Sequence, residues 1–185
     1  ESSDGLKQIF VLRQSGTDEG TNDLSPDIKI TFYDEGKEKN MILDAFKIVQ
    51  QYPLLITYNG DGFDLPYLYN RAEKLGIGKE NNPFYMMRDS ATLRKGVHLD
   101  LYRTMSNRAF QIYAFGQKYN DFSLNSVSNG LLNEKKIDYG IELGDLTLYQ
   151  TAKYCQNDAR LTYKLTSFDN DLLMNLLVVI SRIAR

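Results

Sequence analysis

The stretch YNGDGFDLPYL, residues 58–68, decides the fold, because it joins an apolar strand to a helix. The residues that lead into it, Leu54–Tyr58, form a continuous apolar run of the kind buried on both faces of a sheet. Residues 64–75 then have helical spacing, with Asp64 as a natural N-cap and Pro66 in the first turn. An open α/β sheet usually presents its chemistry at such a junction, so we expect a functional site here.

Strands and helices alternate on both sides of this junction. Apolar and β-branched runs predict further strands at residues 7–13, 28–33 and 97–102. Helical spacing predicts four more helices, at residues 41–49, from Ser123 onward, at 145–165 and at 172–184. This order predicts an α/β fold with one mixed β-sheet flanked by helices, in a single domain over residues 1–185.

Composition limits the kind of protein. The chain has 185 residues, of which 42% are hydrophobic and 25% charged, as in ordinary globular domains. Its net charge of −2 argues against tight, autonomous binding to nucleic acid, although a larger body could supply that affinity. The single cysteine, Cys155, excludes an internal disulfide and fits a reducing compartment. The apolar run 172–180 is too short to cross a bilayer, so we expect a soluble intracellular domain without a membrane partner.

Two groups of residues are candidates for chemistry, and each has a structural explanation when taken alone. Helix capping would account for Asp64, and Phe63 could belong to the core or form a wedge beside a site. Asn59 begins an Asn-Gly pair that suits a turn. Tyr154 and Asp158 lie four residues apart on an expected helix, so they share one face, which could be a solvated edge.

The two groups together resemble a known family. Asn59-x-x-x-Phe63-Asp64, followed by Leu-Pro-Tyr-Leu, is similar to the second exonuclease motif of family B DNA polymerases, and Tyr154-x-x-x-Asp158 is similar to the third. Residues 98–102 and 124–136 resemble the segments that connect these motifs. Residues 171–185 resemble the helix that leads to the polymerase palm. The chain therefore looks like a proofreading 3′→5′ exonuclease domain, with archaeal members as the nearest match.

This resemblance implies a ribonuclease H-like fold of the DEDDy type, with four acidic ligands for two divalent ions. Asp64 and Asp158 would be two of these ligands, and Tyr154 would help orient the attacking water. Asn59 and Phe63 would contact the 3′-terminal nucleotide. Two ions can activate water and stabilise the leaving oxygen, and oxygen ligands suit Mg²⁺ or Mn²⁺.

The same resemblance implies the partners. The substrate would be the single-stranded 3′ end of DNA, and the remainder of a parent polymerase chain would hold the rest of that DNA. The expected location is the cytoplasm, in association with the nucleoid if the source is archaeal. The chain starts without Met and ends inside an expected helix, which suggests a piece of a longer protein.

One part of the family pattern is missing. The first exonuclease motif, Asp-x-Glu, does not precede the strand at residues 9–12, so the first strand of the fold is expected to be absent. Glu1 could be the glutamate of that motif, or the parent could lack the motif. In either case we expect the isolated chain to be inactive or nearly so, and an open sheet edge to favour association.

Three other functions remain open on the sequence. The chain could be a stand-alone DEDDy nuclease that acts on RNA or small oligonucleotides. It could instead be a catalytically dead exonuclease fold that serves as a DNA or protein contact scaffold, which the residues upstream of Glu1 would decide. A generic α/β binding module with chance motif matches is the third.

Overall fold

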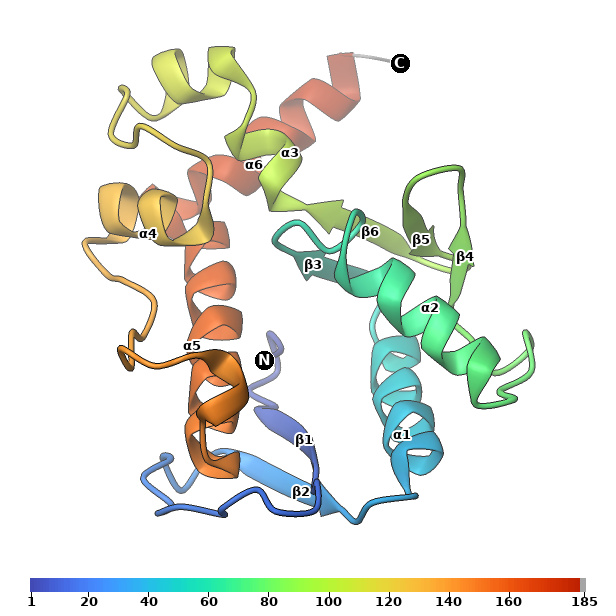
Figure 1. Ribbon diagram of the computed structural model, residues 1–185. Helices are drawn as coiled ribbons and strands as arrows, with labels where there is room; N and C mark the ends of the chain where they lie inside the picture. Colours follow the sequence, from blue (N-terminus) through green and yellow to red (C-terminus); the bar gives the residue numbers. More distant parts are fainter. Residues whose placement is uncertain (184–185) are drawn as a thin grey trace.

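The computed structural model describes residues 1–183 and shows strands in three pairs (Figure 1). β1 (Gln8–Leu12) pairs in parallel with β2 (Lys29–Tyr33), and β3 (Leu54–Thr57) pairs in parallel with β6 (Val97–Asp100). β4 (Phe84–Met86) and β5 (Ala91–Leu93) form an antiparallel hairpin. The α/β class is confirmed, but within the described residues these pairs replace the single mixed sheet, because no strand hydrogen-bonds to both β1 and β3.

The strand predictions were accurate in position but not in burial. β1, β2, β3 and β6 fall inside the predicted ranges, while the β4–β5 hairpin was missed. The expected burial of β3 on both faces is wrong, since Leu54 is 37% exposed and the rest of the strand is half-buried. β3 has one hydrogen-bonded neighbour, β6, and this leaves its other edge uncovered by a strand of residues 1–183.

Helices make up most of the remaining structure. Two short helical turns, π-helical Phe110–Ala114 and 3₁₀ Leu143–Asp145, interrupt the loops. The α-helices are α1 (Glu38–Gln51), α2 (Asp64–Lys74), α3 (Leu101–Met105), α4 (Leu124–Leu132), α5 (Leu148–Thr166) and α6 (Phe168–Ile183).

Two helix starts differ from the sequence predictions. Asp64 is the first residue of α2 and not its cap; Phe63 holds the cap position and makes no capping hydrogen bond. α5 begins at Leu148 and not at Asp145, because Thr147 and Gln150 form a capping box in which each side chain bonds the other's backbone N–H. Asp145 instead ends the 3₁₀ turn.

α6 contains a break near its start. Asp169, Asn170 and Asp171 have left-handed backbone angles, so the regular helix begins about where the sequence predicted, while the predicted last residue, Ala184, lies outside the described residues. The far end of the helix exposes apolar side chains at Val178–Ile180 and Ile183. Among the helices of residues 1–183, none is long and apolar enough to cross a membrane.

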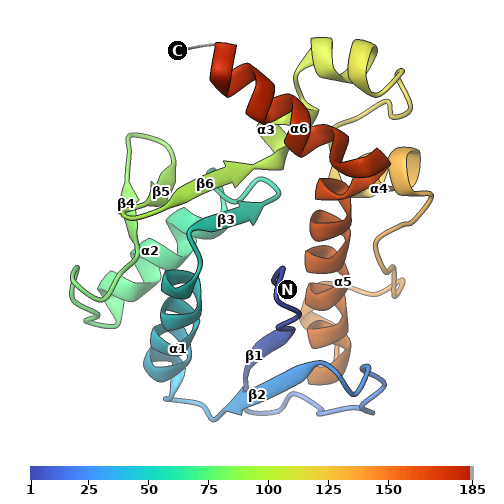
Figure 2. The ribbon, with the colours of Figure 1, turned by 180° about the vertical axis from the view of Figure 1, so that it is seen from behind.

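Within the described residues the core has three clusters, and α5 contributes side chains to two of them. Phe46 of α1 packs edge-on against Phe84 of β4, at 5.5 Å between ring centroids, in a cluster with α2 and β5. A second cluster joins α3, α4, α6 and the end of α5, around Leu165. The start of α5 packs on Val11 of β1. In both views the β3 arrow points toward the part of α5 that lies nearest α6 (Figures 1 and 2), which brings the junction after β3 toward that helix.

Candidate active site

The loop between β3 and α2 lies where two parallel strands end. Thr57, the last residue of β3, is the register partner of Asp100, the last residue of β6. The loop therefore starts beside Asp100 and delivers Asp64 at the first turn of α2. Three predicted site residues, Asn59, Phe63 and Asp64, lie on this short segment.

The carboxylate of Asp100 holds this loop. Its Oδ1 accepts hydrogen bonds from the backbone N–H groups of Asn59 (2.7 Å) and Tyr102 (3.0 Å), and its Oδ2 accepts one from Asp61 (3.0 Å). Desolvation and a hydrogen bond with the Asp61 carboxyl group raise the pKa of Asp100 to about 6. Asp61 in turn forms an ion pair with Arg103 of α3.

Asn59 and Phe63 are both available to a ligand. Asn59 has a left-handed backbone angle, φ 63°, which asparagine tolerates well, and its residue is exposed. Phe63 is 68% exposed, so it is not a core residue. An aromatic ring so exposed at a helix start is a surface on which a nucleobase could stack.

On α5, Asp158 has two differently bonded carboxylate oxygens. Oδ2 forms an ion pair with the Lys136 ammonium at 2.7 Å. Oδ1 is buried and accepts no hydrogen bond from any part of the chain that the structure describes. Desolvation raises the pKa of Asp158, although the Lys136 charge opposes this rise. A buried carboxylate oxygen without a donor is suited to a cation.

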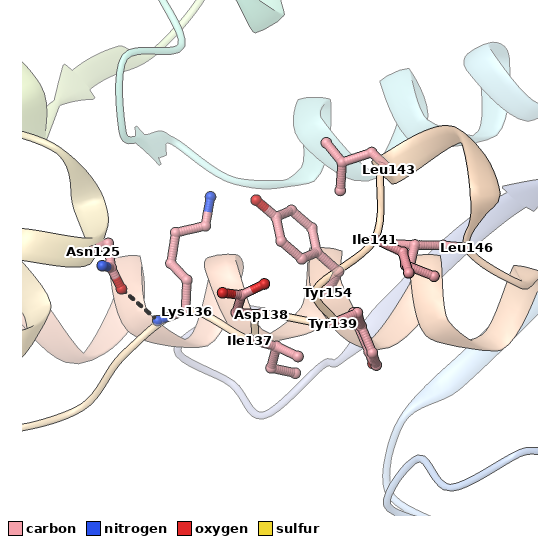
Figure 3. A pocket seen from close by; sticks show the side chains of 9 residues that line it. All are labelled: Asn125, Lys136, Ile137, Asp138, Tyr139, Ile141, Leu143, Leu146 and Tyr154. Carbon is pink, nitrogen blue, oxygen red and sulfur yellow. Dashed lines mark hydrogen bonds between the residues drawn. The ribbon is translucent and has the colours of Figure 1, made fainter.

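Lys136 also reaches Tyr154. Its ammonium nitrogen lies 4.7 Å from the centroid of the Tyr154 ring, so one cation contacts both predicted residues of α5. Figure 3 shows the two side chains extending in the same direction. The Lys136 backbone N–H donates to Asn125 Oδ1 at 3.0 Å, and Glu134 nearby binds Arg160 (2.5 Å) and Lys164 (2.6 Å) of α5.

The sequence did not single out Lys136. It follows another lysine, Lys135, and no periodic or motif signal separates the two. Their surroundings in the structure do so, because the Lys135 residue is exposed while Lys136 is partly buried against α5.

Asp64 and Asp158 lie in one neighbourhood. Desolvation raises the pKa of Asp64, and the negative charge of Asp158 raises it further. The pKa of the Cys155 thiol is raised in the same way, first by desolvation and then by the charges of Asp158 and Asp64. Residues from the two distant motifs therefore interact electrostatically between the start of α2 and α5.

A cavity of about 340 Å³ opens beside Tyr154 (Figure 3). Lys136 and Asn125 line one side of it, and Ile141 and Leu143 from the loop before α5 line another. This mixture of amide, cation and apolar groups beside the candidate pair gives space for a partly polar ligand.

The acidic residues present fit part of a metal site. The orphaned Oδ1 of Asp158 and the raised pKa of Asp64 are what two ligands without their cation would show. Within residues 1–183, however, no three His, Cys, Asp or Glu side chains gather in a metal-binding group. Glu1 lines a second cavity with Cys155 and does not join the pair.

The sequence of this chain is similar to those of known proteins. A family model described as DNA polymerase family B, exonuclease domain, matches residues 2–127. The chain is 37% identical to DNA polymerase 1 of Aeropyrum pernix over 183 residues and 39% identical to that of Saccharolobus solfataricus over 184 residues. Both alignments cover 99% of this chain but only 19% and 20% of those relatives, respectively. A DNA polymerase of Pyrococcus glycovorans is 31% identical over 69% of the chain and 18% of its own length.

Proposed function

Because this chain belongs to the exonuclease domain family of family B DNA polymerases, we propose that it removes nucleotides one at a time from the single-stranded 3′ end of DNA. It would do so as the proofreading part of a longer polymerase chain. The observation that carries the proposal is the buried Oδ1 of Asp158, which has no donor in the described chain, together with the charge of Asp158 acting on Asp64. Stacked and paired termini would enter less readily than frayed mismatches, because pairing energy must be given up.

The loop after β3 supports binding of the 3′ end. Phe63 is exposed at the start of α2 and would stack on the terminal base, and Asn59 on the same loop would contact the terminal nucleotide. Lys136 adds a positive charge on the α5 side, which suits the phosphate group to be cleaved. These contacts would place the terminal phosphodiester between α2 and α5.

The residues of α5 would then direct the reaction. Lys136 holds the Asp158 carboxylate and the Tyr154 ring in fixed positions, and the Tyr154 phenol would orient the attacking water. The water oxygen bonds to phosphorus, the bond from phosphorus to the 3′ oxygen breaks, and a water proton ends on that oxygen. The products are a nucleoside 5′-monophosphate and a shortened strand.

Asp64 and Asp158 would hold divalent ions, and the oxygen ligands suit Mg²⁺ or Mn²⁺. When bound, such ions lower the pKa of the attacking water and stabilise negative charge on the leaving oxygen. Two ions need more carboxylates than the described residues bring together. We propose that an upstream Asp-x-Glu completes the site and that its strand belongs to a ribonuclease H-like sheet with β1 and β3.

The test is hydrolysis of a 5′-labelled single-stranded oligonucleotide with Mg²⁺ by the complete protein that contains this chain. Asp64→Ala and Asp158→Asn should each lower the rate by more than about a hundredfold, since even groups that only support metal ligands are worth roughly 10–100-fold. Asp145→Asn, an exposed aspartate of the 3₁₀ turn, is the matched control and should keep the parent rate.

If Asp64→Ala and Asp158→Asn hydrolyse DNA at the parent rate, the proposed function is wrong. A separate outcome is that the unaltered protein does not hydrolyse DNA but still binds it. The catalytically dead scaffold function would then replace the proposed exonuclease function.

A further inference from the structure

The Asp100 carboxylate makes more hydrogen bonds than its position requires. Asp100 is the N-cap of α3, and the bond from the Tyr102 N–H is the capping bond. Two further bonds come from the loop after β3, from the N–H groups of Asn59 and Asp61. Capping therefore explains one of three contacts. Asp100 is 5% exposed, so all three form away from bulk water.

The two additional contacts fix an unusual turn. Asn59 has a left-handed φ of 63°, and Gly60 next to it is buried. A Cβ atom at Gly60 would lie 2.5 Å from the Thr57 side chain, so this segment has no room to shift inward. Asp100 thus holds the turn from one side while Thr57 limits it from the other.

The turn is connected directly to the candidate site. The Gly60 carbonyl accepts a hydrogen bond from the Leu65 N–H at 2.8 Å, and Leu65 directly follows Asp64 in α2. A shift of the turn would therefore move Asn59 immediately and Asp64 through the Gly60–Leu65 bond. Both carboxylate oxygens of Asp100 already accept backbone N–H groups, so Asp100 has little capacity left to act as a ligand itself.

We propose that Asp100 is a positioning residue for the exonuclease reaction: it fixes the turn Asn59–Asp61 and thereby orients Asn59 and Asp64. This inference rests on the proposed function. It assigns the geometry of the loop after β3 to an acidic side chain outside that loop, at the end of another strand, β6. The expected signature is a loss of turnover that exceeds what a lost helix cap would cause.

The key variant is Asp100→Asn in the complete protein. Asparagine caps helices as well as aspartate does, and its Oδ1 can still accept from Asn59 and Tyr102. Its amide NH₂ would then face the Asp61 N–H, so that contact alone is lost. Asp100→Ala, which removes all three bonds, is the stronger variant, and Asp100→Asn keeps the test valid if Asp100→Ala does not fold.

We expect Asp100→Asn to lower kcat on the single-stranded oligonucleotide by about tenfold to a hundredfold with a nearly unchanged KM, because small misplacements of reacting groups have effects of that order. Backbone amides in residues 58–66 should exchange with deuterium faster. Thr147→Ala removes the cap of α5 and is the control: it should lower the melting temperature without changing kcat.

A parent kcat in Asp100→Asn overturns the inference, as does a lower kcat without faster exchange in residues 58–66. A kcat loss no larger than that of Thr147→Ala would also overturn it, since capping alone would then suffice. Loss of hydrolysis in Asp64→Ala alongside a parent kcat in Asp100→Asn rejects only the positioning role. Undiminished hydrolysis in Asp64→Ala rejects the proposed function and this inference together.

Discussion

Asp100 and Asp158 are both shielded aspartates, but their surroundings differ. Asp100 accepts three backbone N–H groups and is 5% exposed, whereas Asp158 has one ion pair and one buried oxygen with no donor in the described chain. The carboxylate oxygens of Asp100 are therefore already bonded by backbone N–H groups of this chain. The buried Oδ1 of Asp158 can still accept a bond, for which the described residues supply no donor. Counting the donors around a carboxylate thus separates a structural acid from a candidate functional one.

The largest expected effect concerns the incomplete metal site formed by Asp64 and Asp158. The 185-residue chain alone should hydrolyse a 5′-labelled oligonucleotide at least about a hundredfold more slowly than a longer protein that also contains an upstream Asp-x-Glu. Loss of groups that only support metal ligands already lowers activity roughly 10–100-fold, and here metal ligands themselves would be missing. The physical reason is that, within the described residues, no group of three His, Cys, Asp or Glu side chains forms that could hold a metal ion around Asp64 and Asp158. A gel assay with Mg²⁺ measures it. Rapid shortening from the 3′ end by the 185-residue chain would contradict the prediction.

The second effect tests the cation beside Asp158. Lys136→Met in the complete protein should lower the hydrolysis rate roughly 10–100-fold, as groups that orient metal ligands do. It removes the charge that holds the Asp158 carboxylate and contacts the Tyr154 ring. Lys135→Met is the matched control, because the neighbouring Lys135 residue is exposed. Equal rates in the two variants would show that Lys136 is not needed.

The third effect uses the protonation of Asp100. Its pKa is raised to about 6 from the ordinary 3.8, because of desolvation and the hydrogen bond with Asp61, so the folded state binds this proton more tightly than the unfolded state does. The contribution of this proton to the free energy of unfolding is fully present below pH about 4 and is lost as pH rises through about 6. The loss should be roughly 2–3 kcal/mol.

Urea unfolding at a series of pH values measures this loss. Asp100→Asn is the control, since it has no carboxyl group to titrate, and it should reduce the slope between pH 4 and 7. The raised pKa values of Asp64 and Asp158 act in the same direction and would account for the slope that remains. An unchanged slope in Asp100→Asn would contradict the prediction.

The smallest effect compares two glycines of the same loop. Gly60→Ala should destabilise the protein by about 1–3 kcal/mol, the usual cost of overpacking, because the new Cβ would lie 2.5 Å from Thr57. Gly62→Ala should be nearly neutral, since among residues 1–183 its Cβ would meet only Asn59 Oδ1, at 3.5 Å. Thermal unfolding of both variants checks this. Similar melting temperatures would show that the loop can move away from Thr57.

The sequence predicted which segments become strands and helices better than it predicted how they meet. Apolar runs located β1, β2, β3 and β6, because the apolar side chains that a strand buries are visible within that strand's own sequence. They could not show that the strands form separate pairs, since pairing depends on partners far along the chain. The short hairpin β4–β5 was missed for the same reason, as its three-residue strands carry too little pattern.

The candidate site was predicted in part. The motif resemblance named Asp64, Tyr154 and Asp158, and the family is confirmed by the comparisons, while the catalytic roles of these residues stay predictions. Capping by Asp64 was wrong, because the residue sits one position inside α2. Lys136 and the contacts of Asp100 could not be predicted, since both act through distant backbone or side-chain groups that no local pattern records.

The rigid length of α5 has a consequence for which insertions and deletions the chain can tolerate. Tyr154 and Asp158 lie inside this uninterrupted helix, whose beginning packs on β1 and whose end joins the cluster around Leu165. Adding or removing one residue between those two anchors would turn the side chains beyond it by about 100° around the helix axis. Variation in length among homologous chains should therefore be confined to the loops on either side of Leu148–Thr166.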